Sequence, residues 1–151
     1  MTGQDRQLSF QLETLGTPET VRDILGDLRA RLQNIGLDED RCGTVEIVMA
    51  EALNNIVEHA YAPQCEGPLC LSARLDRGHL VIRTRDRGHP LPGLTLPKRA
   101  LPDATGPLDS LPEGGFGWSL IHDLTETAQY TRKASENRLT LTFAINPPVS
   151  A

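Results

Sequence analysis

The sequence lacks an excess of positive charge. It contains 15 lysine and arginine residues against 20 aspartate and glutamate residues, which gives a formal net charge of -5. Proteins that bind nucleic acids through their phosphates present a concentrated basic patch, and the sequence shows none. This charge balance argues against a nucleic-acid-binding surface.

Long apolar segments are also missing. No apolar run approaches the roughly 20 residues that a helix needs to cross a bilayer. The first ten residues, MTGQDRQLSF, do not contain the hydrophobic core of a signal peptide. We therefore expect a cytoplasmic protein without a membrane segment.

Cysteine is scarce, with only Cys42, Cys65 and Cys70 in the chain. A structural zinc site needs four ligands, usually in two close pairs, and this spacing does not supply them. We expect three reduced thiols. The four histidines are scattered, so the sequence predicts no metal ion held by protein side chains alone.

A chain of 151 residues with 38% hydrophobic and 23% charged residues has the composition of one globular domain. A chain of this length buries roughly 70% of the surface of its unfolded form, which is enough for folding without disulfides or metals. We expect a single domain over residues 1–151.

Hydrophobic periodicity predicts the order strand, two helices, hairpin, long loop, short helix and hairpin. The expected elements are a strand at 8–12, a helix from Thr17-Pro18 to Gly36, a helix from Asp38 to about His59 or Tyr61, strands at 69–76 and 79–86 around Arg77-Gly78, a helix at 118–124, and strands at 128–133 and 138–145 around 135–137. This order predicts an α+β fold, a two-layer sandwich whose mixed, mostly antiparallel sheet carries helices on one face.

Between the two predicted hairpins lies a proline-rich stretch, from Arg87 to Glu113. It contains six of the 11 prolines and almost no apolar periodicity. A loop of this length inside a compact domain is usually functional or mobile.

The second predicted helix carries the first group of candidate residues, Glu51, Asn55 and His59. Their spacing of four places them on one face, on the side opposite Leu53. This can be a solvated helix face. In the chemical interpretation, Asn55 offers an amide oxygen to Mg²⁺ and Glu51 accepts a proton from a nucleophilic hydroxyl.

The second group is Asp86-Arg87-Gly88, at the end of a predicted strand. Asp-x-Gly is a common turn signal, and a turn is needed here in any case. In the functional interpretation, the carboxylate of Asp86 accepts a hydrogen bond from a purine amino group and Gly88 lets the backbone approach the ring.

The third group is the run Gly114-Gly115-Phe116-Gly117, which opens the short helix. Unpaired N–H groups at a helix start form an anion site suited to phosphates, although a flexible hinge explains the glycines equally well. The run matches neither the Walker pattern nor the dinucleotide fingerprint, because the preceding segment is a loop and no Gly-Lys-Ser/Thr follows.

In this order and spacing, the three groups resemble the histidine-kinase-like (GHKL, Bergerat-type) ATPase domain. Within that superfamily the chain looks like the small anti-sigma-factor serine kinases of bacterial partner switching. The resemblance covers nearly the whole chain. The segments Ala50-Glu51-Ala52 and His59-Ala60-Tyr61 fit this subfamily more closely than they fit sensor histidine kinases.

The resemblance implies a role for each matching position. Glu51 matches the catalytic base of the family and Asn55 its Mg²⁺ ligand. Asp86 matches the aspartate that holds the adenine amino group, and Gly88 matches the glycine beside the ring.

Other matches concern the phosphates and the partners. Gly115 and Gly117 match the glycines under the phosphates, and the stretch from about Pro92 to Glu113 matches the mobile ATP lid. Arg22, early in the first helix, aligns with an arginine that contacts partner proteins.

The sequence departs from the family at two places. The family often has Gly-Thr at the start of the last strand, near the adenine, whereas this chain has Asn137-Arg138 and leaves Thr140 as the substitute. The resemblance leaves the roles of the basic lid residues Lys98 and Arg99 open.

The resemblance implies an anti-sigma regulatory factor that is also an ATP- and Mg²⁺-dependent protein serine/threonine kinase. Its substrate would be a serine of a STAS-type anti-anti-sigma antagonist, a sigma factor would be a second partner, and the chain would form a homodimer. One alternative is a non-catalytic ATP-binding module that only sequesters its partner. A detached catalytic domain of a sensor histidine kinase is the other.

Overall fold

Two helices form where the sequence supplies caps for them. In the computed structural model, which describes residues 8–61, 67–97 and 115–145, α1 spans Pro18–Asn34 and α2 spans Glu39–Asn55. The Thr17 hydroxyl accepts a hydrogen bond from the Thr20 backbone N–H at 3.1 Å, and the Asp38 carboxylate accepts one from the Arg41 N–H at 2.8 Å. These bonds satisfy N–H groups that have no partner inside the helix. Both predicted helix starts are confirmed.

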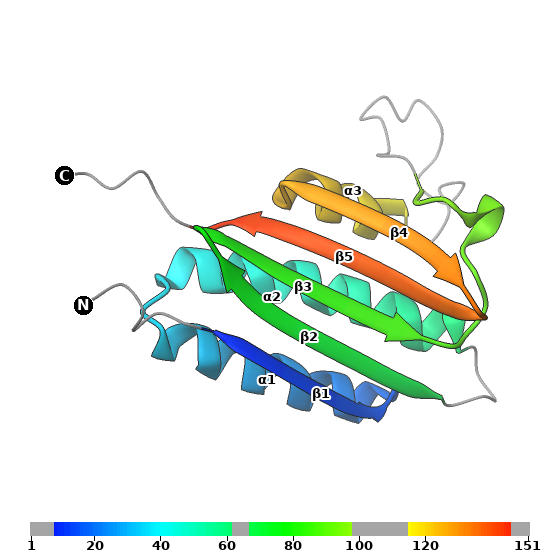
Figure 1. Cartoon of the computed structure of the whole chain (residues 1–151), viewed down its shortest axis with the longest axis horizontal. Helices are drawn as coiled ribbons and strands as arrows, with labels where there is room; N and C mark the ends of the chain where they lie inside the picture. Colours follow the sequence, from blue (N-terminus) through cyan, green and yellow to red (C-terminus); the bar gives the residue numbers. More distant parts are fainter. Residues whose placement is uncertain (1–7, 62–66, 98–114, 146–151) are drawn as a thin grey trace.

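The strands form one five-stranded sheet in the order β1-β2-β3-β5-β4, and every neighbouring pair is antiparallel. Figure 1 shows α1, α2 and α3 on the same face of this sheet. The predicted two-layer α+β sandwich is therefore confirmed. The strands are β1 (Ser9–Leu15), β2 (Pro68–Asp76), β3 (His79–Asp86), β4 (Thr127–Lys133) and β5 (Glu136–Ala144), and the third helix is α3 (Gly115–Leu124).

The core lies between the sheet and the helices. Side chains of alternate strand residues point to opposite faces, so each strand contributes every second residue to it. The helices contribute stripes at helical spacing, which buries the apolar residues of the second predicted helix. The core includes Leu28, Leu32, Val45, Met49, Leu53, Leu71, Leu80, Ile82, Leu141 and Phe143. None of the helices formed by the described residues is long and apolar enough to span a bilayer.

After Asn55, α2 runs directly into the π-helical turn η2 (Ile56–Ala60), closed by a hydrogen bond from the Tyr61 N–H to the Ile56 carbonyl at 2.9 Å. A π turn inside a helix is rare and often occurs at a functional site. The sequence predicted a regular helix to the end of this segment. The wider turn changes the direction in which residues after Asn55 project, and His59 is exposed.

The hairpin between β4 and β5 is tighter than the sequence predicted. Its turn consists of Ala134 and Ser135, both with positive φ (55° and 63°), instead of residues 135–137. Neither residue type signals positive φ, which Gly or Asn usually supplies in such turns. The difference matters because it moves Asn137 out of the turn and into β5, directly opposite Asp86 of β3.

Candidate functional site

A cleft opens where β3 and β5 meet the C-terminal end of α2 and the first turns of α3. The cavity inside it has a volume of about 40 Å³. Its walls are mostly apolar, with a few polar side chains that converge on them. The lining residues are Ala52, Asn55, Ile56, Ala60, Asp86, His89, Leu91, Trp118, Tyr130, Asn137 and Leu139.

Asp86, the last residue of β3, is a buried carboxylate in this cleft, with only 5% of its surface exposed. Its Oδ1 accepts hydrogen bonds from Asn137 Nδ2 at 2.8 Å and from the Gly88 N–H at 2.9 Å. Burial raises the pKa of Asp86, while these two bonds and the positive charge of Arg132 act in the opposite direction. The group is thus a hydrogen-bond acceptor in a largely apolar wall, which suits a ligand amino group.

The packing of the backbone around Gly88 requires a glycine at this position, whether or not a ligand is bound. A Cβ atom at this position would lie 2.4 Å from the carbonyl oxygen of Ala60, at the end of η2. The N–H of His89 donates to that same oxygen at 2.8 Å. The glycine therefore lets the turn after β3 pack against the end of the second helix, a reason distinct from the ring contact that the resemblance implies.

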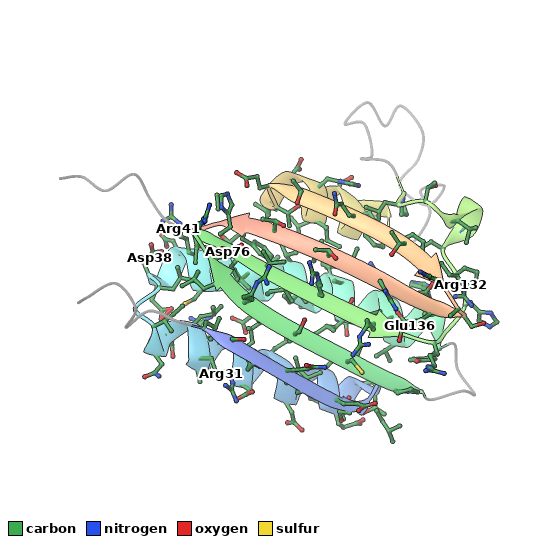
Figure 2. The ribbon with its side chains drawn as sticks, viewed as in Figure 1. Arg31, Asp38, Arg41, Asp76, Arg132 and Glu136 are labelled. Carbon is green, nitrogen blue, oxygen red and sulfur yellow. The ribbon has the colours of Figure 1, made fainter. Side chains whose placement is uncertain are left out.

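Asn137 is the cleft residue with the most side-chain hydrogen bonds that sequence reasoning did not include among its candidates. It is 5% exposed, and its amide joins Asp86 to Tyr130 and Arg132 of β4 through hydrogen bonds of 2.6 to 2.9 Å. Figure 2 shows Arg132 at the end of the sheet where β4 turns into β5. The sequence did show Asn137-Arg138 where the family often has Gly-Thr. Because the turn was predicted at 135–137, Asn137 was not expected to lie on the strand beside Asp86.

Thr140, which sequence reasoning put near the adenine, lies on the other face of the sheet. It is separated from Asn137 by three positions on β5, so the two side chains point to opposite faces. Thr140 pairs with Arg83 and Gln129 and lines a shallow hollow on the sheet face away from the helices. The alternation of the strand removes Thr140 from the cleft.

Glu51 and Gly117 meet where α2 packs against α3. Glu51 is half-buried, and a Cβ atom at Gly117, the third residue of α3, would lie 2.6 Å from Glu51 Oε2. A larger residue at this position would require the end of the Glu51 side chain to move. The first turn of α3 carries N–H groups without partners inside the helix, so the structure brings together a carboxylate and a site that favours negative charge.

Asn55, one turn after Glu51 on α2, lines the cleft from the helix side. Its Nδ2 atom is buried and has no hydrogen-bond partner among the described residues. Leaving a buried polar group unsatisfied costs on the order of 1–3 kcal/mol. This unused hydrogen-bonding capacity fits a polar ligand in the cleft, and the amide also carries the kind of oxygen that Mg²⁺ prefers.

The remaining predicted residues lie apart from this centre or outside the described residues. Gly115 is the first residue of α3, and Arg22 is exposed on α1 and does not line the cleft. Of the predicted lid, the structure describes the short helix η3 (Pro92–Leu94) and the segment to Pro97, whose carbonyl is 2.9 Å from His122 Nε2 on α3. Residues 98–113 of the lid, with Lys98 and Arg99, and also Gly114, are outside the described residues.

The sequence of the chain is similar to those of a known domain family and of two protein kinases. Residues 15–143 match the histidine kinase-like ATPase domain family. The chain is 33% identical over 100 residues to the serine/threonine-protein kinase BtrW of Bordetella bronchiseptica, which covers 66% of this chain and 68% of that protein. It is 25% identical over 118 residues to the serine-protein kinase RsbW of Oceanobacillus iheyensis, over 78% of this chain and 75% of that protein.

Solved structures share the fold. The RsbU and RsbW domains of Rv1364c from Mycobacterium tuberculosis superpose with a TM-score of 0.65 at 21% identity, over 93% of this chain and 33% of that longer chain. A blue-light activated histidine kinase of Erythrobacter litoralis EL346 has a TM-score of 0.55 at 14% identity, over 85% of this chain and 43% of that chain. This chain thus spans about a third to two fifths of these proteins, and the likeness concerns the fold alone.

Proposed function

Because the chain belongs to the histidine kinase-like ATPase domain family, we propose that it is an ATP- and Mg²⁺-dependent protein serine kinase. Its substrate is a serine on a STAS-type anti-anti-sigma antagonist, and it also sequesters a sigma factor. The names of the two kinase relatives support the reaction, and the residues of the cleft support the nucleotide.

The base of ATP enters the apolar part of the cleft. Asp86 accepts a hydrogen bond from the adenine amino group, since it is a buried acceptor fixed at the end of β3. Leu91, Ile56 and Leu139 supply apolar surface for the flat ring. Sites of this kind use apolar walls for affinity and a few fixed polar groups for orientation.

The phosphates lie toward the start of α3. The backbone N–H groups of its first turn, at Gly115 and Gly117, donate to phosphate oxygens, which the positive end of the helix also attracts. The amide oxygen of Asn55 would hold Mg²⁺ together with the phosphates, and its unpartnered Nδ2 would donate to a phosphate oxygen. When bound, Mg²⁺ neutralises the charge that develops on the transferred phosphoryl group.

Glu51 acts on the serine. Its carboxylate accepts the hydroxyl proton as the serine oxygen bonds to the γ-phosphorus and the bond from phosphorus to the bridging oxygen of ADP breaks. A glutamate side chain is ionised at neutral pH and is ready to accept a proton. The observation that supports the proposal most is the proximity of this carboxylate to Gly117, where an added Cβ atom would lie 2.6 Å from Glu51 Oε2 at the start of the helix proposed to bind the phosphates.

The remaining parts of the proposal concern partners and context. Arg22, exposed on α1 and away from the cleft, is placed to contact a partner protein without blocking the nucleotide. We further propose a homodimer, a single domain over residues 1–151, an ATP lid at about 92–113 and a cytoplasmic location.

The proposal is tested by incubating the protein with labelled ATP, Mg²⁺ and a purified STAS-domain protein encoded beside its gene. We expect phosphoserine on the STAS protein, and none on a variant whose acceptor serine is replaced by alanine. Nucleotide binding without transfer would instead favour the non-catalytic binding module. An acid-labile phosphohistidine would favour the histidine kinase alternative.

A further inference from the structure

We propose that Asn137 is a positioning residue that fixes Asp86 and the wall of the cleft, and that it thereby sets the preference for adenine over guanine. The inference rests on the proposed nucleotide site and extends it to a residue on β5 that the catalytic assignments do not include.

The amide of Asn137 uses its full hydrogen-bonding capacity, two donors and an oxygen with two lone pairs. Nδ2 donates to Asp86 Oδ1 at 2.8 Å and to the His89 carbonyl at 2.9 Å. Oδ1 accepts from the Tyr130 hydroxyl at 2.6 Å and from Arg132 Nη1 at 2.9 Å. The group is 5% exposed, so water does not compete freely for these partners.

These partners allow one orientation of the amide. If it rotated by 180°, its oxygen would face Asp86 and the His89 carbonyl, which are both acceptors, and its NH₂ group would face the Arg132 guanidinium, which can only donate. Asn137 therefore always presents a donor to Asp86.

This donor fixes the carboxylate of Asp86. Both of its described hydrogen bonds, from Asn137 and from the Gly88 N–H, end on Oδ1, so Oδ2 is the oxygen available to a ligand. An adenine amino group donates to such an oxygen. The carbonyl oxygen that guanine carries at the same ring position would face a negative charge and be repelled.

The amide oxygen of Asn137 fixes the part of the cleft wall formed by the segment after β3. Tyr130, held by Asn137, accepts at its hydroxyl from the Leu91 N–H at 3.1 Å, and Arg132 Nη1 also donates to the Gly88 carbonyl at 2.8 Å. Leu91 and His89 line the cleft. One amide thus fixes both the polar acceptor and the segment that packs against the base.

The experiment measures the affinities for ATP and GTP with Mg²⁺, and the kcat and KM of phosphorylation, for the wild type and for Asn137→Leu. A hydrogen bond to a charged group contributes about 1.5–3 kcal/mol, so we expect ATP affinity to fall roughly 10- to 100-fold. GTP affinity should change much less, so the ATP preference falls by a similar factor. At saturating ATP, kcat should stay within about twofold, because Glu51 and Gly117 are untouched.

Tyr130→Phe is the matched control. It removes the hydroxyl bonds to Asn137 and Leu91 but keeps the bond from Asn137 to Asp86. We expect ATP affinity to fall less than in Asn137→Leu and the preference for ATP over GTP to remain.

Asn137→Asp tests the same inference through the pH dependence of ATP affinity. This variant keeps the inference testable if Asn137→Leu does not fold. In Asn137→Leu, Asp86 loses its donor and its pKa rises further, so ATP affinity should fall with acidification at a higher pH than in the wild type. In Asn137→Asp, the introduced carboxyl group donates to Asp86 only while it is protonated, and ATP affinity should fall as the pH rises and the two carboxylates repel each other. The other titratable groups around Asp86 in the described part of the chain include Arg132, Glu136, Tyr61, Tyr130 and His89.

Unchanged ATP preference in folded Asn137→Leu, or the same pH dependence in Asn137→Asp as in the wild type, would overturn the inference. So would a wild type that binds ATP and GTP equally. A wild type that binds neither nucleotide would contradict the proposed function itself.

Discussion

The two ends of the cleft differ in how much of the binding site the protein completes by itself. At the end formed by β3, β4 and β5, Asp86, Asn137, Tyr130 and Arg132 form a continuous hydrogen-bond network. At the end formed by α2 and α3, Asn55 has a buried amide nitrogen without a described partner and Glu51 lies against a glycine. The end formed by the strands thus has a hydrogen-bond network within the protein, whereas the end formed by the helices keeps a buried amide nitrogen without a described partner.

This difference has a physical consequence for each end. A network centred on the fully hydrogen-bonded Asn137 holds its side chains in one geometry and leaves Asp86 Oδ2 for a ligand, which suits the recognition of one fixed base. In the proposed function, the Asn55 amide nitrogen and the first N–H groups of α3 would gain partners only when phosphates bind, so that binding energy would be available for the reaction at that end. We call the end formed by β3, β4 and β5 the base end and the end formed by α2 and α3 the phosphate end. The comparison predicts that substitutions at the base end alter the affinity for ATP and that substitutions at the phosphate end alter the rate of phosphorylation.

The largest expected effect is that of Glu51→Gln. The substitution keeps the shape of the side chain but removes the proton acceptor, and general-base catalysis contributes about 10²–10⁴-fold. We expect phosphorylation of the antagonist to fall at least about 100-fold with ATP affinity unchanged, measured by phosphotransfer and by calorimetry. A wild-type rate in Glu51→Gln would refute the division of roles between the two ends.

Gly117→Ala should have the next largest effect. The added Cβ would lie 2.6 Å from Glu51 Oε2 and must displace the carboxylate. A misplacement of about 1 Å costs up to about 10²-fold in rate. In a double-mutant cycle, Gly117→Ala should slow the Glu51→Gln enzyme much less than the wild type, since the two residues act together. Additive effects would mean that Gly117 acts independently of Glu51.

Asp86→Asn tests the base end. The amide places a donor where the adenine amino group needs an acceptor, which costs on the order of 1–3 kcal/mol, or roughly 5- to 150-fold in ATP affinity. We expect this loss in calorimetry, with kcat at saturating ATP nearly unchanged. If kcat fell instead of the affinity, Asp86 would belong to the chemistry and the comparison would fail.

Gly88→Ala should act on stability. Its Cβ would lie 2.4 Å from the Ala60 carbonyl oxygen, and such overpacking typically costs about 1–3 kcal/mol. For a chain of this length the melting temperature should fall by roughly 3–10 °C. Gly26→Ala on α1 is the matched control, because a Cβ there meets nothing within 4 Å, and it should raise the melting temperature slightly. Equal melting temperatures for the two variants would contradict the packing role of Gly88.

The smallest effect concerns pH and stability. Burial raises the pKa of Asp86, so the native state binds its proton more tightly than the unfolded state does. As the pH rises above about 3.9, wild-type stability should therefore fall relative to that of Asp86→Asn. ATP affinity should change in the opposite sense, decreasing as the pH falls and Asp86 is protonated. Unfolding and binding curves measured from about pH 4 upward follow both, and trends of equal sign would contradict this account of Asp86.

Much of the fold follows from local sequence signals. Thr17 and Asp38 cap the helices, Arg77-Gly78 forms a tight turn, and strand residues alternate between core and surface, all as the sequence predicts. These features depend on interactions between residues close in the chain, so the residue types and their spacing are enough to predict them. The positions of Glu51, Asn55 and Asp86 on their helix and strand were predictable for the same reason.

What only the tertiary structure decided depends on contacts between distant residues. Packing and pairing fixed the turn at Ala134-Ser135 against the local preference for Gly or Asn, and this register placed Asn137 beside Asp86 and turned Thr140 to the opposite face. The requirement for glycine at position 88 likewise comes from the backbone of Ala60, and the close approach of Gly117 to Glu51 also joins residues far apart in sequence. A sequence pattern names the residue types that a site needs, but strand register and close packing decide which of them meet.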